Sequence, residues 1–203
     1  NVGSSIYSNG TIESTIVNAT ILDNKTWNDT GLGKIYVLNA TLTDDMGNSI
    51  YDPNFRFTVN GTVIADEPLY DDETGLYTLD YVVEKARLNV ISTSYNAINL
   101  LVFTGALDIP LANVTEFTVK VESIVKGENA TVFITLIGVN DVGLDSIVTL
   151  IVNNKEYNVT VNNGAGNTTL DNLTPGSYPV VAMFEDPNYE SAINSTVFYV
   201  KAA

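Results

Sequence analysis

Twelve asparagines lie in Asn-x-Ser/Thr sequons, the acceptor sequence for N-linked glycans. The chain has 24 Asn and 35 Ser plus Thr among 203 residues, so chance alone predicts about four sequons. This excess favours a glycosylated, exported protein; accidental sequons in an Asn- and Thr-rich chain are the alternative. The candidate acceptors are Asn9, Asn18, Asn24, Asn28, Asn39, Asn60, Asn113, Asn129, Asn158, Asn167, Asn172 and Asn194.

Two acidic clusters could bind a hard cation. Asp71, Asp72 and Glu73 precede a glycine, and Asp44 and Asp45 lie in a second turn-like segment. Ca²⁺ takes six to eight oxygen ligands from such loops, so it is the one cofactor that the sequence leaves open. The chain has no Asp-x-Asp-x-Asp-Gly loop, and a solvated acidic turn is the simpler interpretation.

The composition argues against catalysis and against polyanionic partners. The chain has no Cys and no His, so it lacks a thiol nucleophile, the commonest general base and the commonest transition-metal ligand. Its net charge is −15, which disfavours nucleic acid and anionic membranes. No apolar run is long enough to cross a bilayer. We expect no enzyme activity, no catalytic residue and no direct membrane insertion of this segment.

Nearly all of the chain has the pattern of β-strands. Val, Ile, Thr, Tyr and Phe are abundant, turn residues recur about every 8–12 positions, and no segment has a long 3.6-residue period. An all-β fold is therefore predicted. The expected strands are 34–43, 55–64, 76–83, 88–94, 117–121, 130–137, 147–152, 156–161, 178–184 and 195–200.

Strand alternation predicts the orientation of two sequons. Asn158 alternates with Tyr157 and Val159, and Asn60 follows Val59 in the same way. Because successive side chains of a strand point to opposite faces, we expect both asparagines to face solvent, where a glycan can be accommodated.

An internal repeat divides the chain. Residues 42–47 and 136–143 each precede a strand that ends in Val-Asn, and Gly75 and Gly176 each stand two residues before a tyrosine. Matched positions are roughly 100 residues apart, the length of one sandwich domain. Pro110 interrupts the pattern. We predict two tandem Ig-like Greek-key β-sandwich domains, over residues 1–109 and 110–203.

The two Gly-x-Tyr motifs have a structural interpretation. Tyr77 and Tyr178 stand where a sandwich domain can form a tyrosine corner, in which the hydroxyl binds nearby backbone. We therefore expect both to be structural, with a sugar-stacking role as the second interpretation.

Short motifs in both halves resemble known surface repeats. The second half resembles Ig-like repeats of large adhesin-like surface proteins of methanogenic archaea and of bacteria; the matching stretches are 126–132, 152–157, 173–178 and 184–189. The first half looks like an invasin-type Ig repeat, through 44–48, 57–61, 75–77 and 93–95. The resemblance spans roughly residues 34–203 and implies a stalk or adhesive repeat without catalytic or ligand residues.

Residues 1–33 fit this pattern less well. Residues 11–22 form one long apolar strand, either the first strand of the first domain or an arm that completes the sheet of a neighbouring copy. The strand-donation candidates are Ile12, Ile16, Val17, Ile21 and Leu22.

The sequence thus predicts a non-catalytic, N-glycosylated repeat on the extracellular surface of a cell, acting as a stalk or adhesin segment. Its expected partners are adjacent repeats or copies of the same protein and the surface of a host or partner cell. The alternative is a subunit of a self-assembling, pilus-like extracellular filament joined head to tail by strand donation. A carbohydrate-binding module would require an exposed aromatic platform.

Overall fold

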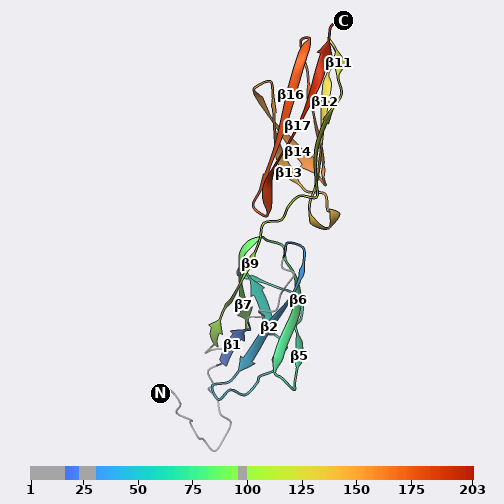
Figure 1. Cartoon of the computed structure of the whole chain (residues 1–203). Coiled ribbons are helices and arrows are strands. Elements are labelled where there is room, and N and C mark those ends of the chain that lie inside the picture. The colour runs from blue at the N-terminus through green and yellow to red at the C-terminus, as the bar shows by residue number, and fades with distance from the viewer. Residues whose placement is uncertain (1–16, 23–30, 96–99) are drawn as a thin grey trace, which may run out of the picture. The chain divides into compact units, whose positions relative to one another are not determined.

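The computed structural model of this chain describes residues 17–22, 31–95 and 100–203. Apart from one short 3₁₀ turn at Val139–Asp141, its regular elements are β-strands, which confirms the all-β class. The chain divides into two compact units, Asn1–Pro110 and Leu111–Ala203 (Figure 1). No helix among the described residues is long and apolar enough to span a membrane.

Unit 1 contains two sheets, in which all strand pairs but one among the described residues are antiparallel. The five-stranded sheet has the order β5-β6-β2-β1-β8 and the four-stranded sheet the order β4-β3-β7-β9. The first comprises β5 (Leu69–Asp71), β6 (Leu76–Val82), β2 (Ile35–Thr43), β1 (Val17–Ile21) and β8 (Leu100–Phe103). The second comprises β4 (Thr62–Val63), β3 (Arg56–Val59), β7 (Arg87–Ser94) and β9 (Gly105–Ile109).

Aromatic packing between the sheets forms much of the core of unit 1. Phe55 stacks on Tyr77 with ring centroids 4.1 Å apart and meets Phe57 edge-on at 5.5 Å. Leu38 and Leu42 of β2 are buried beside them. These inward positions alternate with outward ones along each strand, as the period of two requires.

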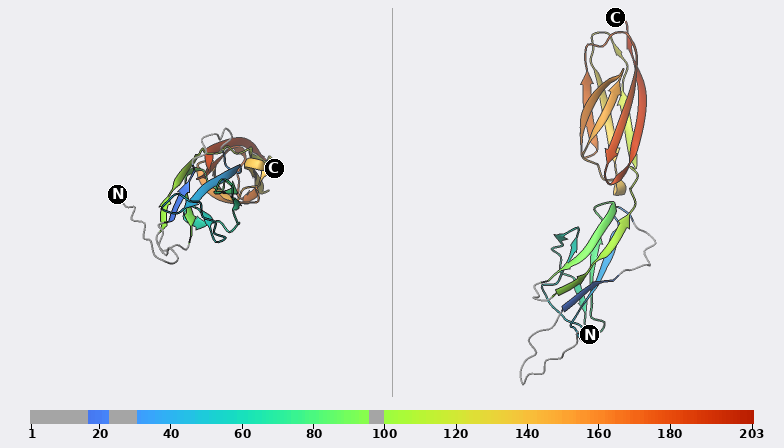
Figure 2. Two further views of the ribbon diagram at one scale, coloured as in Figure 1. Left: turned by 90° about the horizontal axis from the view of Figure 1, so that it is seen from below. Right: turned by 90° about the vertical axis from the view of Figure 1, so that its left-hand side faces the viewer.

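Unit 2 is one eight-stranded sheet that folds over its own core (Figure 2). Its order is β10-β12-β15-β14-β13-β16-β17-β11. The members are β10 (Glu116–Val121), β11 (Ile124–Val125), β12 (Ala130–Ile137), β13 (Ser146–Val152), β14 (Lys155–Asn162), β15 (Ala165–Leu170), β16 (Gly176–Asp186) and β17 (Tyr189–Lys201).

One side chain joins two strands that are not neighbours in the strand order of unit 2. Asn194 of β17 donates from Nδ2 to the carbonyl oxygen of Phe117 in β10, at 2.5 Å. The inner face between the layers is apolar: Val132, Ile134 and Leu150 are almost fully buried. Burial of such side chains is the main stabilising term of a sandwich core.

Candidate modification and interaction sites

The acidic turns use their carboxylates to shape backbone. Asp44 Oδ1 accepts hydrogen bonds from the backbone N–H groups of Met46 (2.9 Å) and Asn48 (2.8 Å), and Oδ2 accepts from Asn48 Nδ2 at 2.8 Å. These bonds, the one from the Asn48 side chain first, lower the pKa of Asp44. Each of these hydrogen bonds stabilises the charged form of the Asp44 carboxylate within its own turn.

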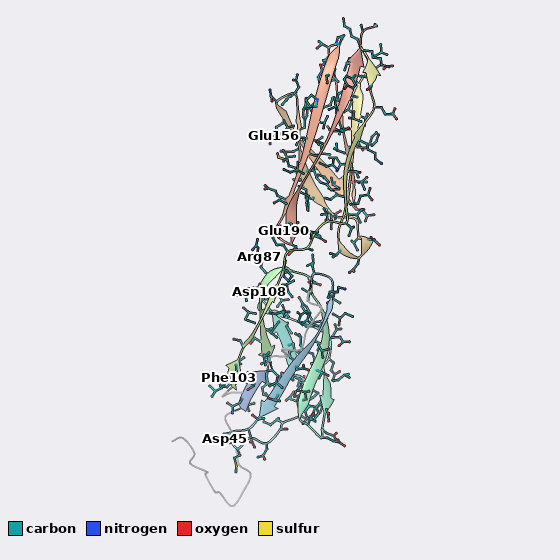
Figure 3. The ribbon with its side chains drawn as sticks, viewed as in Figure 1. Asp45, Arg87, Phe103, Asp108, Glu156 and Glu190 are labelled. Atoms are coloured by element: carbon teal, nitrogen blue, oxygen red, sulfur yellow. The ribbon has the colours of Figure 1, made fainter. Side chains whose placement is uncertain are left out.

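The second acidic turn has the same construction. Asp71 Oδ1 accepts from the backbone N–H groups of Glu73 (2.9 Å) and Thr74 (3.3 Å), and hydrogen bonding, from the Thr74 side chain first, lowers its pKa. Asp45 and Asp72 are exposed, Asp45 projecting from unit 1 in Figure 3. Among the residues that the structure describes, no three Asp, Glu, His or Cys are grouped to hold a metal ion.

Both predicted tyrosine corners are confirmed. The Tyr178 hydroxyl donates to the carbonyl oxygen of Thr174 at 3.0 Å and accepts from the Thr174 N–H at 3.1 Å. The Tyr77 hydroxyl donates to the carbonyl of Ile50 at 2.9 Å and accepts from the N–H of Asp52 at 2.7 Å. Burial raises the pKa of Tyr77 to about 12. Both side chains are also buried, so neither presents a ring face on which a sugar could stack.

The sequons of unit 1 are covered or engaged where the structure describes them. Asn39 is only 8% exposed, in the middle of the five-stranded sheet, and Asn18 is half-buried in β1. Asn60 is exposed, but it lies in the turn between β3 and β4, with φ +51°, and not on the strand face that its phase predicted. Its Nδ2 donates to Asn89 Oδ1 at 2.8 Å and its Oδ1 accepts from the Val90 N–H at 2.9 Å. Asn9, Asn24 and Asn28 lie outside the described residues.

Unit 2 presents most of its sequons to solvent. Five of its sequon asparagines are exposed: Asn113, Asn129, Asn158, Asn167 and Asn172. Asn158 lies on the outer face of β14, as predicted, beside the outward-pointing Glu156 (Figure 3). Asn194 differs from these five, because it is half-buried and its Nδ2 donates to the carbonyl oxygen of Phe117. Glycosylation at any of these sequons stays a prediction.

The candidate donor strand is paired within its own chain. β1 runs antiparallel to β2, with Asn18 opposite Thr43, and parallel to β8, with Val17 opposite Leu100. Val17 is buried, Ile21 packs on the core of unit 1 and Leu22 is 41% exposed, whereas Ile12 and Ile16 lie outside the described residues. In this arrangement β1 is a strand of the first sandwich.

Strand β8 exposes an apolar edge that the sequence analysis missed. It lies at the end of the five-stranded sheet, and Leu101, Val102 and Phe103 are 51%, 38% and 54% exposed; Figure 3 shows Phe103 at the surface. The uninterrupted apolar run Leu-Leu-Val-Phe was the signal available, since edge strands of this kind are rarely left open in proteins.

The sequence analysis also missed the exposed Phe133 of β12. It is 55% exposed and lies directly opposite Asn167 of β15. Its orientation could have been predicted, because Val132 and Ile134 point inward and alternation places Phe133 outward. Its neighbour across the sheet could not, because β15 was not among the expected strands.

A solved structure of low sequence identity shares this fold. The Yersinia pseudotuberculosis adhesin InvE matches with a TM-score of 0.53 at 14% identity, over 92% of this chain and 59% of that chain. The fibronectin(III)-like modules of Clostridium thermocellum CbhA match at 0.35 and 14% identity, over 91% of this chain and 94% of theirs. Domains 4 and 5 of the S-layer protein SbsC match at 0.37 and 12% identity, over 91% and 98%.

The fold is Ig-like. This chain spans 59% of the InvE structure, and at 14% identity the likeness concerns architecture alone. No family model and no curated protein matches the sequence.

Proposed function

We propose that this chain is a non-catalytic, N-glycosylated structural or adhesive repeat on the outer surface of a cell. The observation that carries the proposal is the placement of the sequons of unit 2, five of which present an exposed asparagine from strands and turns of a tightly hydrogen-bonded sandwich. Glycans at such positions shield sheet surfaces, and a net charge of −15 keeps neighbouring molecules apart.

The fold supports this assignment. InvE, which matches this chain with a TM-score of 0.53, is an adhesin. The turn-forming role of Asp44 and Asp71 accounts for the acidic clusters without Ca²⁺; a bound Ca²⁺ at either turn stays a proposal. The predicted archaeal source rests on the sequence resemblance.

Surface exposure is tested by labelling intact cells with an amine reagent that does not cross membranes. Lys85 in unit 1 and Lys126 in unit 2 are exposed, so both should be labelled on intact cells, while a cytoplasmic marker protein stays unlabelled. Labelling of both lysines only after lysis would contradict a surface location.

Glycan occupancy is tested by mass spectrometry of the natural protein. We expect glycans at exposed sequons of unit 2 and bare side chains at Asn39 and Asn194, because Asn39 is buried and Asn194 is half-buried with its Nδ2 bonded to the Phe117 carbonyl. Unmodified asparagine at most sequons would remove the glycan coat from the proposal.

A second candidate function is a filament subunit joined by strand exchange. The observation that favours it is that β1 is inserted between β2 and β8, so a β1 from another copy could occupy the same place with the same hydrogen bonds. The chain contains no Cys, which makes cysteine cross-linking of this position specific.

Asn18 and Thr43 are opposite each other in the β1–β2 ladder, within the distance that a disulfide requires. Single variants Asn18→Cys and Thr43→Cys are mixed under assembly conditions and oxidised. A cross-linked dimer indicates exchange of β1 between copies. The double variant, which carries both substitutions in one chain, is oxidised in parallel. If it forms only an intramolecular disulfide and the mixed single variants stay monomeric, each copy pairs with its own β1, as the repeat model requires.

A further inference from the structure

Phe133 and Asn167 form a cross-strand pair on the outer face of unit 2. They are opposite each other in the antiparallel β12–β15 ladder, where directly opposed Cβ atoms are about 4.5–5.5 Å apart. Asn167 is exposed and so is Thr169, the hydroxyl residue of its sequon. An acceptor amide and a large aromatic ring therefore lie side by side in solvent.

The ring is conspicuous because its surroundings are polar. Phe133 is the one large, strongly exposed apolar side chain on β10, β12 and β15, all of whose residues the structure describes. Its neighbour on the other side is Lys120 of β10, and the next outward positions along β12 are Thr131 and Thr135. Packing of the sandwich gives no reason for a phenylalanine at this point.

The backbone around Asn167 is also accessible. β14 pairs with β15 at Val161–Gly166 and Asn162–Ala165, beside the turn, and the ladder between them is not continued to Asn167. β15 is therefore bonded to β12 on one side and open on the other from Asn167 onward. A modifying enzyme can approach an acceptor in such an edge segment more readily than one in a central strand.

We propose that Asn167 carries an N-linked glycan whose first sugar packs against the ring of Phe133. The C–H groups on one face of a pyranose carry partial positive charge and the face of an aromatic ring is negative, so stacking is favourable and covers apolar ring surface. This proposal rests on the glycosylation included in the proposed function and adds the partner that orders one particular glycan.

The covalent step needs an activated glycosyl phosphate as donor. The Asn167 Nδ2–C1 bond forms while the bond from C1 to the phosphate oxygen breaks; the phosphate leaves with the electron pair, and Nδ2 releases one proton. Phe133 takes no part in these bonds and acts after them, by holding the sugar.

Asn158 provides a matched control within the same unit. It is also an exposed sequon on an outer strand face, but its directly opposed neighbour is Thr149, whose hydroxyl lies 3.5 Å from Asn158 Oδ1. A glycan there has no opposed aromatic ring. Differences between the two glycans thus report the contribution of the ring.

The experiment uses the natural full-length protein and the variants Phe133→Ala, Asn167→Gln and Thr149→Ala, all produced in the natural host. Glycopeptide mass spectrometry measures occupancy, and proton NMR measures the shifts of the innermost sugar. Peptide-resolved hydrogen exchange measures the unfolding equilibrium of unit 2. We expect upfield-shifted protons for the sugar on Asn167 and unshifted ones for the sugar on Asn158.

We also expect Phe133→Ala to abolish the upfield shift. In the glycosylated protein this substitution should raise the unfolding equilibrium constant of unit 2, and the increase should be roughly two- to tenfold larger than the one it causes in the Asn167→Gln background. Thr149→Ala should leave the sugar on Asn167 unchanged.

Three results would overturn the proposal: bare Asn167 in the natural protein, a glycan without ring-shifted protons, or equal effects of Phe133→Ala in both backgrounds. A surface-labelled protein with bare Asn167 would refute this inference while leaving the surface function in place.

Discussion

Removing the hydroxyls of the two corner tyrosines tests how the sandwich ends are held. In Tyr77→Phe the ring stays stacked on Phe55, 4.1 Å between centroids, so the change is confined to the hydroxyl. Two hydrogen bonds are lost, to the carbonyl of Ile50 and from the N–H of Asp52. Each contributes about 1 kcal/mol net, and part-buried backbone groups left without a partner cost more.

The expected loss is about 2–3 kcal/mol for Tyr77→Phe. Tyr178→Phe removes the same two kinds of bond, to the carbonyl and N–H of Thr174, and should cost about 1–3 kcal/mol in unit 2. Tyr199→Phe is the control, because Tyr199 is 55% exposed and exposed substitutions usually change stability by less than about 0.5 kcal/mol.

Hydrogen exchange read peptide by peptide is the appropriate assay, because two units need not unfold together and one global transition would average them. Tyr77→Phe should accelerate exchange of unit 1 core strands and Tyr178→Phe that of unit 2. Losses no larger than that of Tyr199→Phe in both units would refute the reasoning that the hydroxyls hold the backbone.

Three further predictions concern unit 1. Gly75→Ala should lower the free energy of unfolding, measured by urea titration, by about 2–4 kcal/mol, because Gly75 has φ +72° and an added Cβ would overlap Ser49. Gly47→Ala is the control: Gly47 has φ +87° but open space around it, so only the backbone strain of about 1–2 kcal/mol should be lost. Equal losses would contradict the steric argument. Asn89→Asp should cost about 2–4 kcal/mol in the same titration, because the buried Asn89 amide donates to the carbonyls of Lys85 (3.0 Å) and Arg87 (3.1 Å) and a carboxylate cannot; an unchanged midpoint would exclude this role. The pKa of Tyr77 is raised to about 12 in the folded protein. The stabilisation linked to the neutral hydroxyl should therefore be complete below pH about 10 and be lost as the pH rises through about 12. In a titration of unfolding free energy against pH, Tyr77→Phe should lose less stability than the natural protein over this range.

Several strands were predictable because each carries its own alternation. β12 was expected at 130–137 and is Ala130–Ile137, since Ala130, Val132, Ile134 and Leu136 share one face. β16 and β17 extend further than expected, to Gly176–Asp186 and Tyr189–Lys201, because their long hairpin continues to pair where the apolar pattern weakens.

Other strands could not be recognised from local pattern. β15 is Ala-Gly-Asn-Thr-Thr-Leu, a polar hexapeptide that is a strand because β12 pairs with it along its whole length. β8 and β9 belong to different sheets although only Thr104 separates them. Such assignments depend on residues far away in sequence, and tertiary context overrides intrinsic strand preference.

The sequence alone determined the fold class, the absence of His and Cys chemistry, the strong negative charge and the positions of the sequons. Those properties follow from residue type and from the two-residue period, which are local. Only the tertiary structure decided that Asn39 is buried, that Asn194 bonds to Phe117 and that Asn167 lies beside Phe133. Strand register brings together residues far apart in the chain, and no local pattern records which strand becomes the neighbour of which.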